Sequence, residues 1–560
     1  MPASAFTRDR SLERLASERF DVLVIGGGIT GAGVALDAAA RGLAVALVEG
    51  DDWGAGTSSK SSKLVHGGLR YLQQRDYLLV REGLVERQRL LANAPHLVKP
   101  LAFLIPLFGR DGVVNRAVAK AYSTALWSYD LVGGMKIGMR HRRIDRAEAA
   151  RLFPPLRADL LVAGFIYWDA RTDDARLTLA VTRTAADHGA AAANHAPVVE
   201  LTRDGQGKVS GAVLGPSQLG ASGVGRSDTS GLRIEARAVV NASGVWADHV
   251  RQLGEPQSPS TLRPAKGVHI TLPAEKLRTD VAVVLPVLGD RRSIFVVPWG
   301  RFVYVGTTDT DYDGALDDPQ CTTDDVAYLV SAVNAFVSSP ISESDVLGTW
   351  AGLRPLVKEA ATERTADLSR RHHVGTSADG LVTVTGGKLT TYRRMAADAV
   401  DAAMIQLGRG GRRLGRSPTK RLRLHGAGGS DGAIPPGPGG ATLDAATVEH
   451  LRGRFGSDAG AVAELATSRP ELAQPLVPGL PYLAAEAVWA AREEMALSLE
   501  DVLARRTRAA ILDRDATAAA GPDVAALLGP EMGWDDAEQH RRVSEFRSRL
   551  DAERRAVSTR

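Results

Sequence analysis

The segment 20–49 constrains the fold more than any other part of the sequence. An apolar run at 22–25 stops at three consecutive glycines and passes into an alanine-rich stretch with a helical pattern. A second apolar run follows at 43–48 and ends at Glu49. The glycines at the start of the helix have the spacing G-x-G-x-x-G: Gly26, Gly28 and Gly31. A strand, a glycine turn, a helix and a second strand in this order predict a parallel strand–helix–strand unit.

This unit predicts a binding site for a dinucleotide. The glycines let the backbone approach a pyrophosphate at the helix N-terminus. Glu49 stands about 20 residues beyond the motif, where an acidic side chain takes a ribose hydroxyl. An acid at this position disfavours a 2′-phosphate. The alternative is a glycine-rich turn with no ligand, and the motif alone does not separate FAD from NAD.

The loop after Glu49 separates these two cofactors. In an NAD dehydrogenase the second strand usually leads into another helix, whereas here it leads into GTSSKSSKLVHGGLRYL at 56–72. A run of hydroxyls and backbone N–H groups suits a flavin ring with its ribityl chain. No flavin-linking His or Cys is evident, so we expect noncovalent FAD. The contacts expected from this loop are Thr57, Ser58, Ser59, Ser61, Ser62 and Lys63.

Ending in HGGLRY, this loop resembles the FAD-dependent glycerol-3-phosphate dehydrogenases, the aerobic, quinone-reducing kind. Further motifs of that family follow in order: VVNASGVWAD at 239–248, KGVHI at 266–270, VGTTDTDY at 305–312, AGLRPL at 351–356 and GGKLTTYR at 386–393. EDVLARRTRAAILD at 500–513 resembles its C-terminal helical domain. The likeness covers roughly residues 18–520.

The resemblance implies an α/β fold of the amino-acid-oxidase-like flavoprotein type. It combines a Rossmann-type FAD-binding domain in separate pieces, an antiparallel-sheet substrate domain and a C-terminal helical domain. The expected FAD-binding pieces are 18–100, 146–261 and 358–407, with a membrane-surface element at 101–145 and the substrate domain at 262–357. A linker is expected at 408–440, the helical domain at 441–520 and a charged tail at 521–560.

The substrate implied by the resemblance is sn-glycerol 3-phosphate, a dianion near neutral pH. Arg70 and Arg354 each lie in an apolar or glycine-rich setting, GGLRYL and AGLRPL. An unpaired cation would be costly there, and the guanidinium fork matches phosphate oxygens. The alternative for each arginine is a structural salt bridge. The resemblance adds Tyr71 and Lys388 to the phosphate site, and Asp309 orients a cation or a substrate hydroxyl, or else caps a turn.

Oxidation at C2 of this substrate needs a proton acceptor beside the flavin. His269, in KGVHI, is the first candidate, and the resemblance favours it over the reading of a buried core histidine. His66 is the rival. We expect His269, Arg354 and Lys388 to be the catalytic residues.

A second strand–glycine–helix junction stands at 382–393. A helix N-terminus aimed at the flavin would stabilise negative charge on the reduced ring; a plain structural turn is the alternative. Together with the turn after the strand at 239–243, this junction adds four expected FAD contacts: Gly244, Gly387, Leu389 and Thr390.

The family passes its electrons to membrane quinone, and one segment suits a membrane surface. Residues 110–143 hold seven Lys or Arg against two acids, with Trp and Tyr between them. An ordinary packed amphipathic helix is the alternative. We expect peripheral attachment to the inner face of the cell membrane, with no spanning segment, because no window of about 18 apolar residues occurs.

Two other functions are considered for this sequence. The same fold could act as an oxidase that reduces oxygen to peroxide. A non-enzymatic FAD- or nucleic-acid-binding protein finds support only in the basic stretch 409–423, and we expect no nucleic-acid partner. We expect no metal site either, since no ligand set with metal-binding spacing occurs, and the single cysteine, Cys321, has no histidine near it in sequence. A homodimer is left open.

Overall fold

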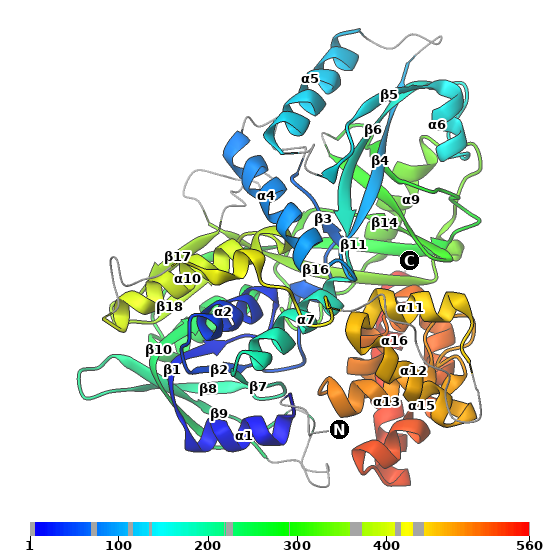
Figure 1. Ribbon diagram of the computed structural model, residues 1–560. Helices are drawn as coiled ribbons and strands as arrows, with labels where there is room; N and C mark the ends of the chain where they lie inside the picture. Colours follow the sequence, from blue (N-terminus) through cyan, green and yellow to red (C-terminus); the bar gives the residue numbers. More distant parts are fainter. Residues whose placement is uncertain are drawn as a thin grey trace.

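The protein is described by a computed structural model over residues 6–68, 76–109, 116–133, 137–217, 219, 228–290, 292–358, 372–408, 416–428 and 442–558. Two β-sheets and a C-terminal group of helices make up this part of the chain (Figure 1). The first sheet lies at the lower left of the view, the second at the upper right and the C-terminal helices at the lower right.

The first sheet has a parallel centre. Its strands in spatial order are β17 (His373–Thr376), β18 (Val382–Thr385), β10 (Arg233–Asn241), β1 (Arg19–Ile25), β2 (Val45–Val48) and β7 (Ala191–Ala193), with β9 (Val209–Leu214) beside β10 and β8 (Val198–Arg203) beside β9. The strands from β18 to β7 run parallel, and Val24 pairs with Val240 on one side and Leu47 on the other. All residues of β2 are buried, which explains its continuous apolar run.

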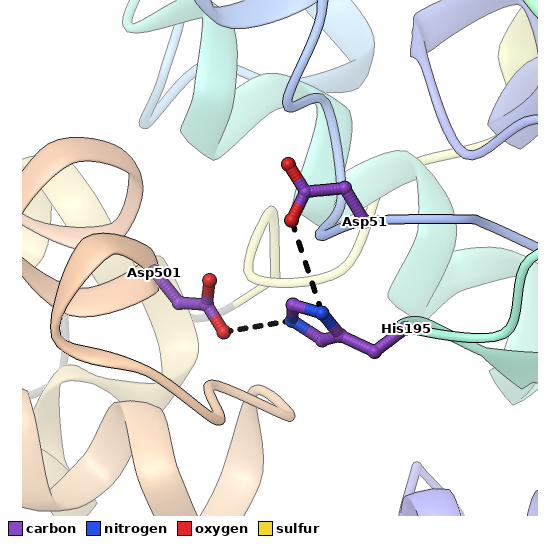
Figure 2. A group of neighbouring side chains, drawn as sticks. All are labelled: Asp51, His195 and Asp501. Carbon is purple, nitrogen blue, oxygen red and sulfur yellow. Dashed lines mark hydrogen bonds and ion pairs between the residues drawn. The ribbon is translucent and has the colours of Figure 1, made fainter. Parts of the chain in front are cut away.

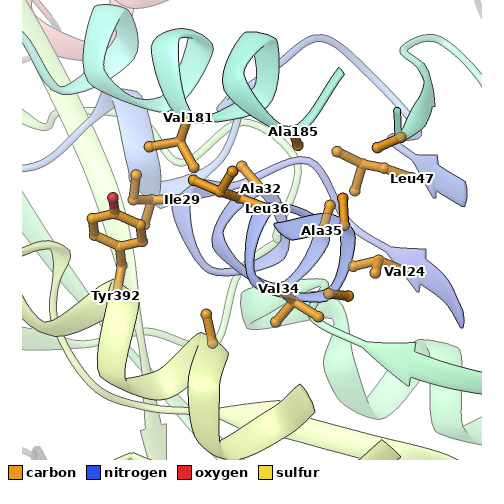
Figure 3. Close-up of a cluster of buried hydrophobic side chains, with 14 of the residues drawn as sticks. Val24, Ile29, Ala32, Val34, Ala35, Leu36, Leu47, Val181, Ala185 and Tyr392 are labelled. Carbon is orange, nitrogen blue, oxygen red and sulfur yellow. The ribbon is translucent and has the colours of Figure 1, made fainter. Parts of the chain in front are cut away.

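Three helices cover one face of this sheet: α2 (Ile29–Ala40), α7 (Asp174–Asp187) and α10 (Tyr392–Gln406). Figure 3 shows α2 between Val181 of α7 and Tyr392 of α10. A Cβ on Gly33 would lie 2.7 Å from the Tyr392 ring, so glycine permits the close approach of α2 and α10. The opposite face packs against α1 (Arg8–Ser17), α8 (Ala247–Gly254) and the β8–β9 hairpin.

The second sheet is mostly antiparallel. Its strands in order are β15 (Thr310–Asp311), β11 (Leu262–Pro273), β14 (Phe302–Gly306), β13 (Ser293–Trp299), β12 (Ala282–Pro286), β4 (Lys99–Phe108), β6 (Leu161–Arg171) and β3 (Leu64–Val65), with β16 (Gly348–Val357) beside β11 and β5 (Arg142–Asp145) beside β6. Buried residues of α6 (Arg146–Leu152) and α9 (Thr323–Asn334) pack on one face. Residues of α4 (Tyr77–Asn93) and α5 (Arg116–Val132) pack on the other.

Besides two short 3₁₀ turns, the described part of the C-terminal group contains six α-helices and one π-helical turn, with two apolar clusters. They are α11 (Ala445–Phe455), α12 (Ala459–Ser468), α13 (Ala484–Glu493), the π-helical turn Asp501–Arg506, α14 (Ala509–Leu512), α15 (Arg514–Met532) and α16 (Asp536–Ser558).

The second sheet is wider than the substrate domain expected at 262–357. It recruits β3, β4, β5 and β6 from earlier in the chain. The apolar run 101–108 was expected in a membrane-surface element, and that expectation is wrong, because the run forms β4 in the middle of the sheet. A short apolar run has the same composition whether it is a buried strand or a surface segment. Only its pairing with other strands distinguishes the two.

The expected charged tail at 521–560 is also wrong for the residues that the structure describes. They are helical through α15 and α16, and Trp534, Phe546 and Leu550 are buried in the C-terminal core. Three well-spaced apolar residues among many charges are easily missed, yet they hold the last helix in place. The described part of the expected linker, 416–428, also packs against the body: Leu424 is buried, and its N–H donates to Asn93 O at 2.8 Å.

Candidate active site

The glycine turn after β1 opens the site at the carboxyl edge of the parallel strands. Gly26 has φ +111°, and a Cβ there would lie 2.7 Å from Ala242 O. A Cβ on Gly31 would lie 1.8 Å from Gly26 O. The backbone of the turn therefore approaches its neighbours too closely for any side chain. Gly28 is the N-cap of α2 and provides no side-chain cap, so the helix N-terminus is a place for an anionic group.

Glu49 directly follows β2, beside this turn. Its Oε2 accepts a hydrogen bond from Gly27 N at 2.5 Å, and its Oε1 accepts one from Asp51 N at 2.9 Å. Burial raises the pKa of Glu49 to about 7, against the lowering effect of these two backbone donors. The acid thus stands at the end of the second strand, where a ribose hydroxyl is expected.

The hydroxyl-rich loop 57–63 runs from the first sheet to the second. Ser58 Oγ accepts a hydrogen bond from Ile29 N at 2.9 Å, at the start of α2. Thr57 Oγ1 donates to Leu353 O in β16 at 2.5 Å. A Cβ on Gly352 would lie 2.7 Å from Lys60 O, so the loop backbone lies directly against this strand. The loop therefore joins the glycine turn to the face of the second sheet.

The end of the loop is held by a buried carboxylate, Asp174, at the start of α7. Ser61 donates to Asp174 through both its N–H, at 3.0 Å, and its Oγ, at 2.7 Å. The Lys63 ammonium, 1% exposed, donates to Asp174 Oδ1 at 3.0 Å and to Ser59 O at 3.1 Å. Burial lowers the pKa of Lys63 to about 8. The Lys63 side chain thus stabilises the loop from within, and a contact of Lys63 with FAD stays a prediction.

His269 stands on β11 next to this loop. The strand register pairs it with Trp350 of β16 and with Gly306 of β14. Its ring stacks on Trp350 with centroids 4.7 Å apart and an interplanar angle of 5°. Its Nε2 lies 2.9 Å from Ser62 Oγ, and its buried Nδ1 has no hydrogen-bond partner among the described residues.

The imidazole of His269 is neutral in this environment. Burial, followed by the charges of Lys63 and Arg354, holds its pKa well below the ordinary value. A neutral imidazole has an unprotonated nitrogen, as a proton acceptor requires. Gly306 leaves room for the ring, since a Cβ there would lie 2.1 Å from His269 Cδ2.

Arg354 lies on the same face of the second sheet, two residues beyond Gly352. Its Nη1 donates to Asp309 Oδ1 at 2.9 Å and its Nη2 to Thr307 Oγ1 at 3.1 Å. It crosses Gly267, where a Cβ would lie 2.4 Å from Nη2. The structure thus favours the alternative in which Asp309 orients a cation. Arg354 is held in place and is still 22% exposed, so contact with an anionic substrate stays a prediction.

The second glycine turn meets the loop at the same edge. Gly386 and Gly387 follow β18 with φ of +73° and +76°, and Lys388 caps the short helix Leu389–Thr391. Thr390 Oγ1 accepts a hydrogen bond from His66 N at 3.2 Å. Gly244, with φ +62°, begins the turn after β10 at this edge as well. These positions stay predicted FAD contacts, and Arg70 and Tyr71 lie outside the described residues.

Sequence reasoning missed several residues of this site. Trp350 stacks on His269 and donates from Nε1 to Ser61 O at 3.2 Å. Tyr304 donates its hydroxyl to Ser62 O at 2.8 Å. Asp174 anchors the loop. A tryptophan just before AGLRPL and the doubled aspartate at 173–174 were visible signals, but only the strand register and the packing of α7 bring them together.

Comparison with known proteins identifies the class first. The family "FAD dependent oxidoreductase" matches residues 21–393, and "C-terminal domain of alpha-glycerophosphate oxidase" matches residues 417–539. The chain is an FAD-dependent oxidoreductase, and the predicted cofactor and fold class are confirmed. The glycine turns, Glu49 and the hydroxyl loop are a set of hydrogen-bonding groups that fits FAD.

The particular family follows from the relatives. "Glycerol-3-phosphate dehydrogenase 2" of Mycobacterium tuberculosis (strain ATCC 25618 / H37Rv) is 41% identical over 546 residues, 97% of this chain and 90% of that protein. The mitochondrial glycerol-3-phosphate dehydrogenase of Homo sapiens is 35% identical over 95% of this chain and 73% of that protein. The crystal structure of the glycerol-3-phosphate dehydrogenase from Bacillus halodurans complexed with FAD is similar with a TM-score of 0.76 and 30% identity, covering 100% of this chain and 99% of that one. The chain belongs to the FAD-dependent glycerol-3-phosphate dehydrogenase family.

Proposed function

We propose that this protein oxidises sn-glycerol 3-phosphate to dihydroxyacetone phosphate and passes the electrons to a membrane quinone. The observation that carries the proposal is the shared face of β11 and β16, where a neutral histidine and an oriented arginine stand beside the loop expected to hold FAD. The names of the relatives support the substrate.

Different residues bind the phosphate of the substrate and its C2 hydroxyl. Arg354, held by Asp309, binds the phosphate dianion, together with Lys388 and with Arg70 and Tyr71. The C2 hydroxyl lies at His269, which accepts its proton, while Ser62 Oγ orients the imidazole through Nε2. His66 is the rival for this step. A bound FAD would supply the acceptor for the C2 hydrogen and its electron pair, and the loss of both hydrogens would leave a carbonyl group at C2.

The quinone part of the proposal rests on the surface of α4 and α5. Among the described residues, four large apolar side chains are widely exposed there: Tyr77 (52%), Leu78 (70%), Trp127 (57%) and Leu131 (78%). Exposed basic residues lie on α5 and on the chain that follows it: Lys120, Arg140, Arg142 and Arg143. Apolar and basic side chains together suit the interface of an anionic membrane. We infer peripheral attachment at the inner face of the cell membrane.

No helix in the described part of the chain is both long enough and apolar enough to cross a bilayer. In Figure 1, α5 projects at the top of the molecule, away from the C-terminal helices, and α4 runs toward the centre.

Product analysis tests this function. Purified protein supplied with sn-glycerol 3-phosphate and a short-chain quinone should form dihydroxyacetone phosphate and quinol in equal amounts. Arg354→Lys should raise KM for the phosphate substrate by about tenfold or more, because a single ammonium cannot reproduce the guanidinium fork. Stoichiometric peroxide in air, with no use of quinone, would instead show an oxidase. No product with either acceptor would contradict the proposal.

A further inference from the structure

The C-terminal helices join the FAD-binding part through a buried ionic junction. Asp52, fully buried in the chain that follows β2, accepts hydrogen bonds from Arg505 Nε at 2.8 Å and Arg506 Nη1 at 2.5 Å. Both arginines belong to the turn between α13 and α14. Arg176 of α7 pairs with Glu494 at 2.7 Å on the other side of the junction. Removing one partner from such a buried set leaves an uncompensated charge, so the junction defines how the helices dock.

A histidine lies inside this junction (Figure 2). His195 Nε2 is 3.1 Å from Asp501 Oδ2, and its Nδ1 is 3.8 Å from Asp51 Oδ1. These three residues could ligate a cation by their spacing. However, the Asp501 carboxylate already accepts from Arg505 at 2.5 Å and from Leu497 N at 2.7 Å. The Arg505 guanidinium already supplies the positive charge that a metal ion would bring. The three residues are therefore part of the ionic junction and not a metal site.

Arg508 reaches from this junction into the loop 57–63. It precedes α14 with φ +66°, a left-handed conformation that is uncommon for arginine, and it is 1% exposed. Its Nη2 donates to Ser59 O and, at 3.2 Å, to Asp174 Oδ1. Residues in such uncommon backbone conformations cluster at functional sites. Arg508 is one of them, and it contacts the backbone of the loop.

From Asp174 the contacts continue to the proposed proton acceptor. Asp174 binds the Lys63 ammonium, which lies 4.7 Å from the centre of the Trp350 ring. Trp350 in turn stacks on His269. The charge of Arg508 also contributes to the lowered pKa of Lys63. Arg508 thus contacts the cofactor loop directly and is linked to His269 through Asp174, Lys63 and Trp350.

Packing is incomplete on this side of the loop. A small pocket of about 40 Å³ adjoins the loop and is lined by Ser59, Lys60, Trp350 and Arg508 among others. A loop backed by a cavity can shift with little loss of apolar contact. Ser59 O accepts hydrogen bonds from both Arg508 Nη2 and Lys63 Nζ, so these two cations oppose a movement of Ser59.

We propose that Arg508 is a positioning residue for the flavin: through Ser59 O and Asp174 it holds the loop 57–63 in the shape that binds FAD, which makes the C-terminal helices part of the cofactor site. The inference rests on the proposed function only in assigning this loop to FAD, and it does not depend on the identity of the substrate.

The test compares two arginines of the same junction in the full-length protein. Arg506 is the matched control, because its hydrogen bonds in the described part of the chain go to Asp52 and to Glu494 O and not to the loop. Arg508→Lys, Arg508→Met, Arg506→Lys and Arg506→Met would be purified with FAD. The measurements are the dissociation constant of FAD from flavin fluorescence, the visible circular dichroism of the bound flavin, and Tm.

The Arg508 variants should weaken FAD binding by about 10-fold to 100-fold, the range expected for losing hydrogen bonds from a charged donor. They should also alter the visible circular dichroism of the flavin that remains bound. The Arg506 variants should lower Tm and leave both flavin signals as in the wild type. Equal changes in the two sets, or none in the Arg508 set, would overturn the proposal, because Arg508 would then only dock the helices.

Arg508→Lys keeps the buried positive charge. If Arg508→Met does not fold, the FAD dissociation constant of Arg508→Lys therefore tests the proposal. Adding sn-glycerol 3-phosphate to the wild type without oxygen separates the two proposals. In one outcome, the wild-type flavin stays oxidised while only the Arg508 variants bind FAD more weakly. That result would refute the proposed function and support the positioning role of Arg508.

Discussion

Gly306→Ala tests the geometry of the proposed proton acceptor with a single methyl group. A Cβ at this position would lie 2.1 Å from His269 Cδ2, whereas ordinary contacts begin near 3.4 Å. The ring must therefore retreat by roughly 1.3 Å, the difference between these distances. That movement disturbs the stacking on Trp350 and the 2.9 Å contact between Nε2 and Ser62 Oγ. A displacement of about 1 Å at a reacting group can lower a rate by about 100-fold.

The expected result is a fall in kcat of about 100-fold with FAD content unchanged. The assay is the steady-state rate with a soluble quinone, together with the flavin absorbance of each preparation. Gly460→Ala is the control, since a Cβ there meets no atom within 4 Å and should change kcat by less than about twofold. If Gly306→Ala keeps a rate within about twofold of the wild type, His269 does not act from the position described here.

Three further predictions follow from other parts of the structure. Gly31→Ala places a methyl group 1.8 Å from the backbone of the glycine turn and should abolish FAD retention on gel filtration; a yellow, saturated variant would refute the close approach. Burial lowers the pKa of His195, but the carboxylates of Asp501 and Asp51 outweigh burial and raise it. Its stabilising effect should be complete below about pH 6.5 and be lost as pH rises through the raised folded-state pKa, so Tm of the wild type should fall over that range more than Tm of His195→Gln. Trp127→Ser with Leu131→Ser should reduce sedimentation with anionic vesicles at unchanged Tm, and equal sedimentation would remove this surface from the membrane proposal.

The features that sequence could predict are those carried by contiguous residues. The glycine turn, Glu49 and the hydroxyl loop each lie within one short segment, and their chemistry follows from local conformation. Parallel strands then bring the turns after β1, β10 and β18 to one edge, as the order of strand, turn and helix predicts.

The features that sequence could not predict depend on pairing between distant segments. Trp350 faces His269 because β11 and β16 pair in one register, and a shift of one residue would turn that side chain to the other face. Arg508 reaches Ser59 across 449 positions of the chain. The membrane-surface assignment failed at 101–108 for the same reason, since only its place between β12 and β6 shows that the run is buried.

The most direct test of the proposed function is anaerobic reduction of the bound flavin in a stopped-flow spectrometer. The absorbance of the oxidised flavin should bleach on mixing with sn-glycerol 3-phosphate, and an equal concentration of glycerol should leave it unchanged, because in the proposed site Arg354 and its neighbours bind the phosphate. A protein that holds FAD and is bleached by dithionite but not by sn-glycerol 3-phosphate would contradict the assignment of substrate to this site.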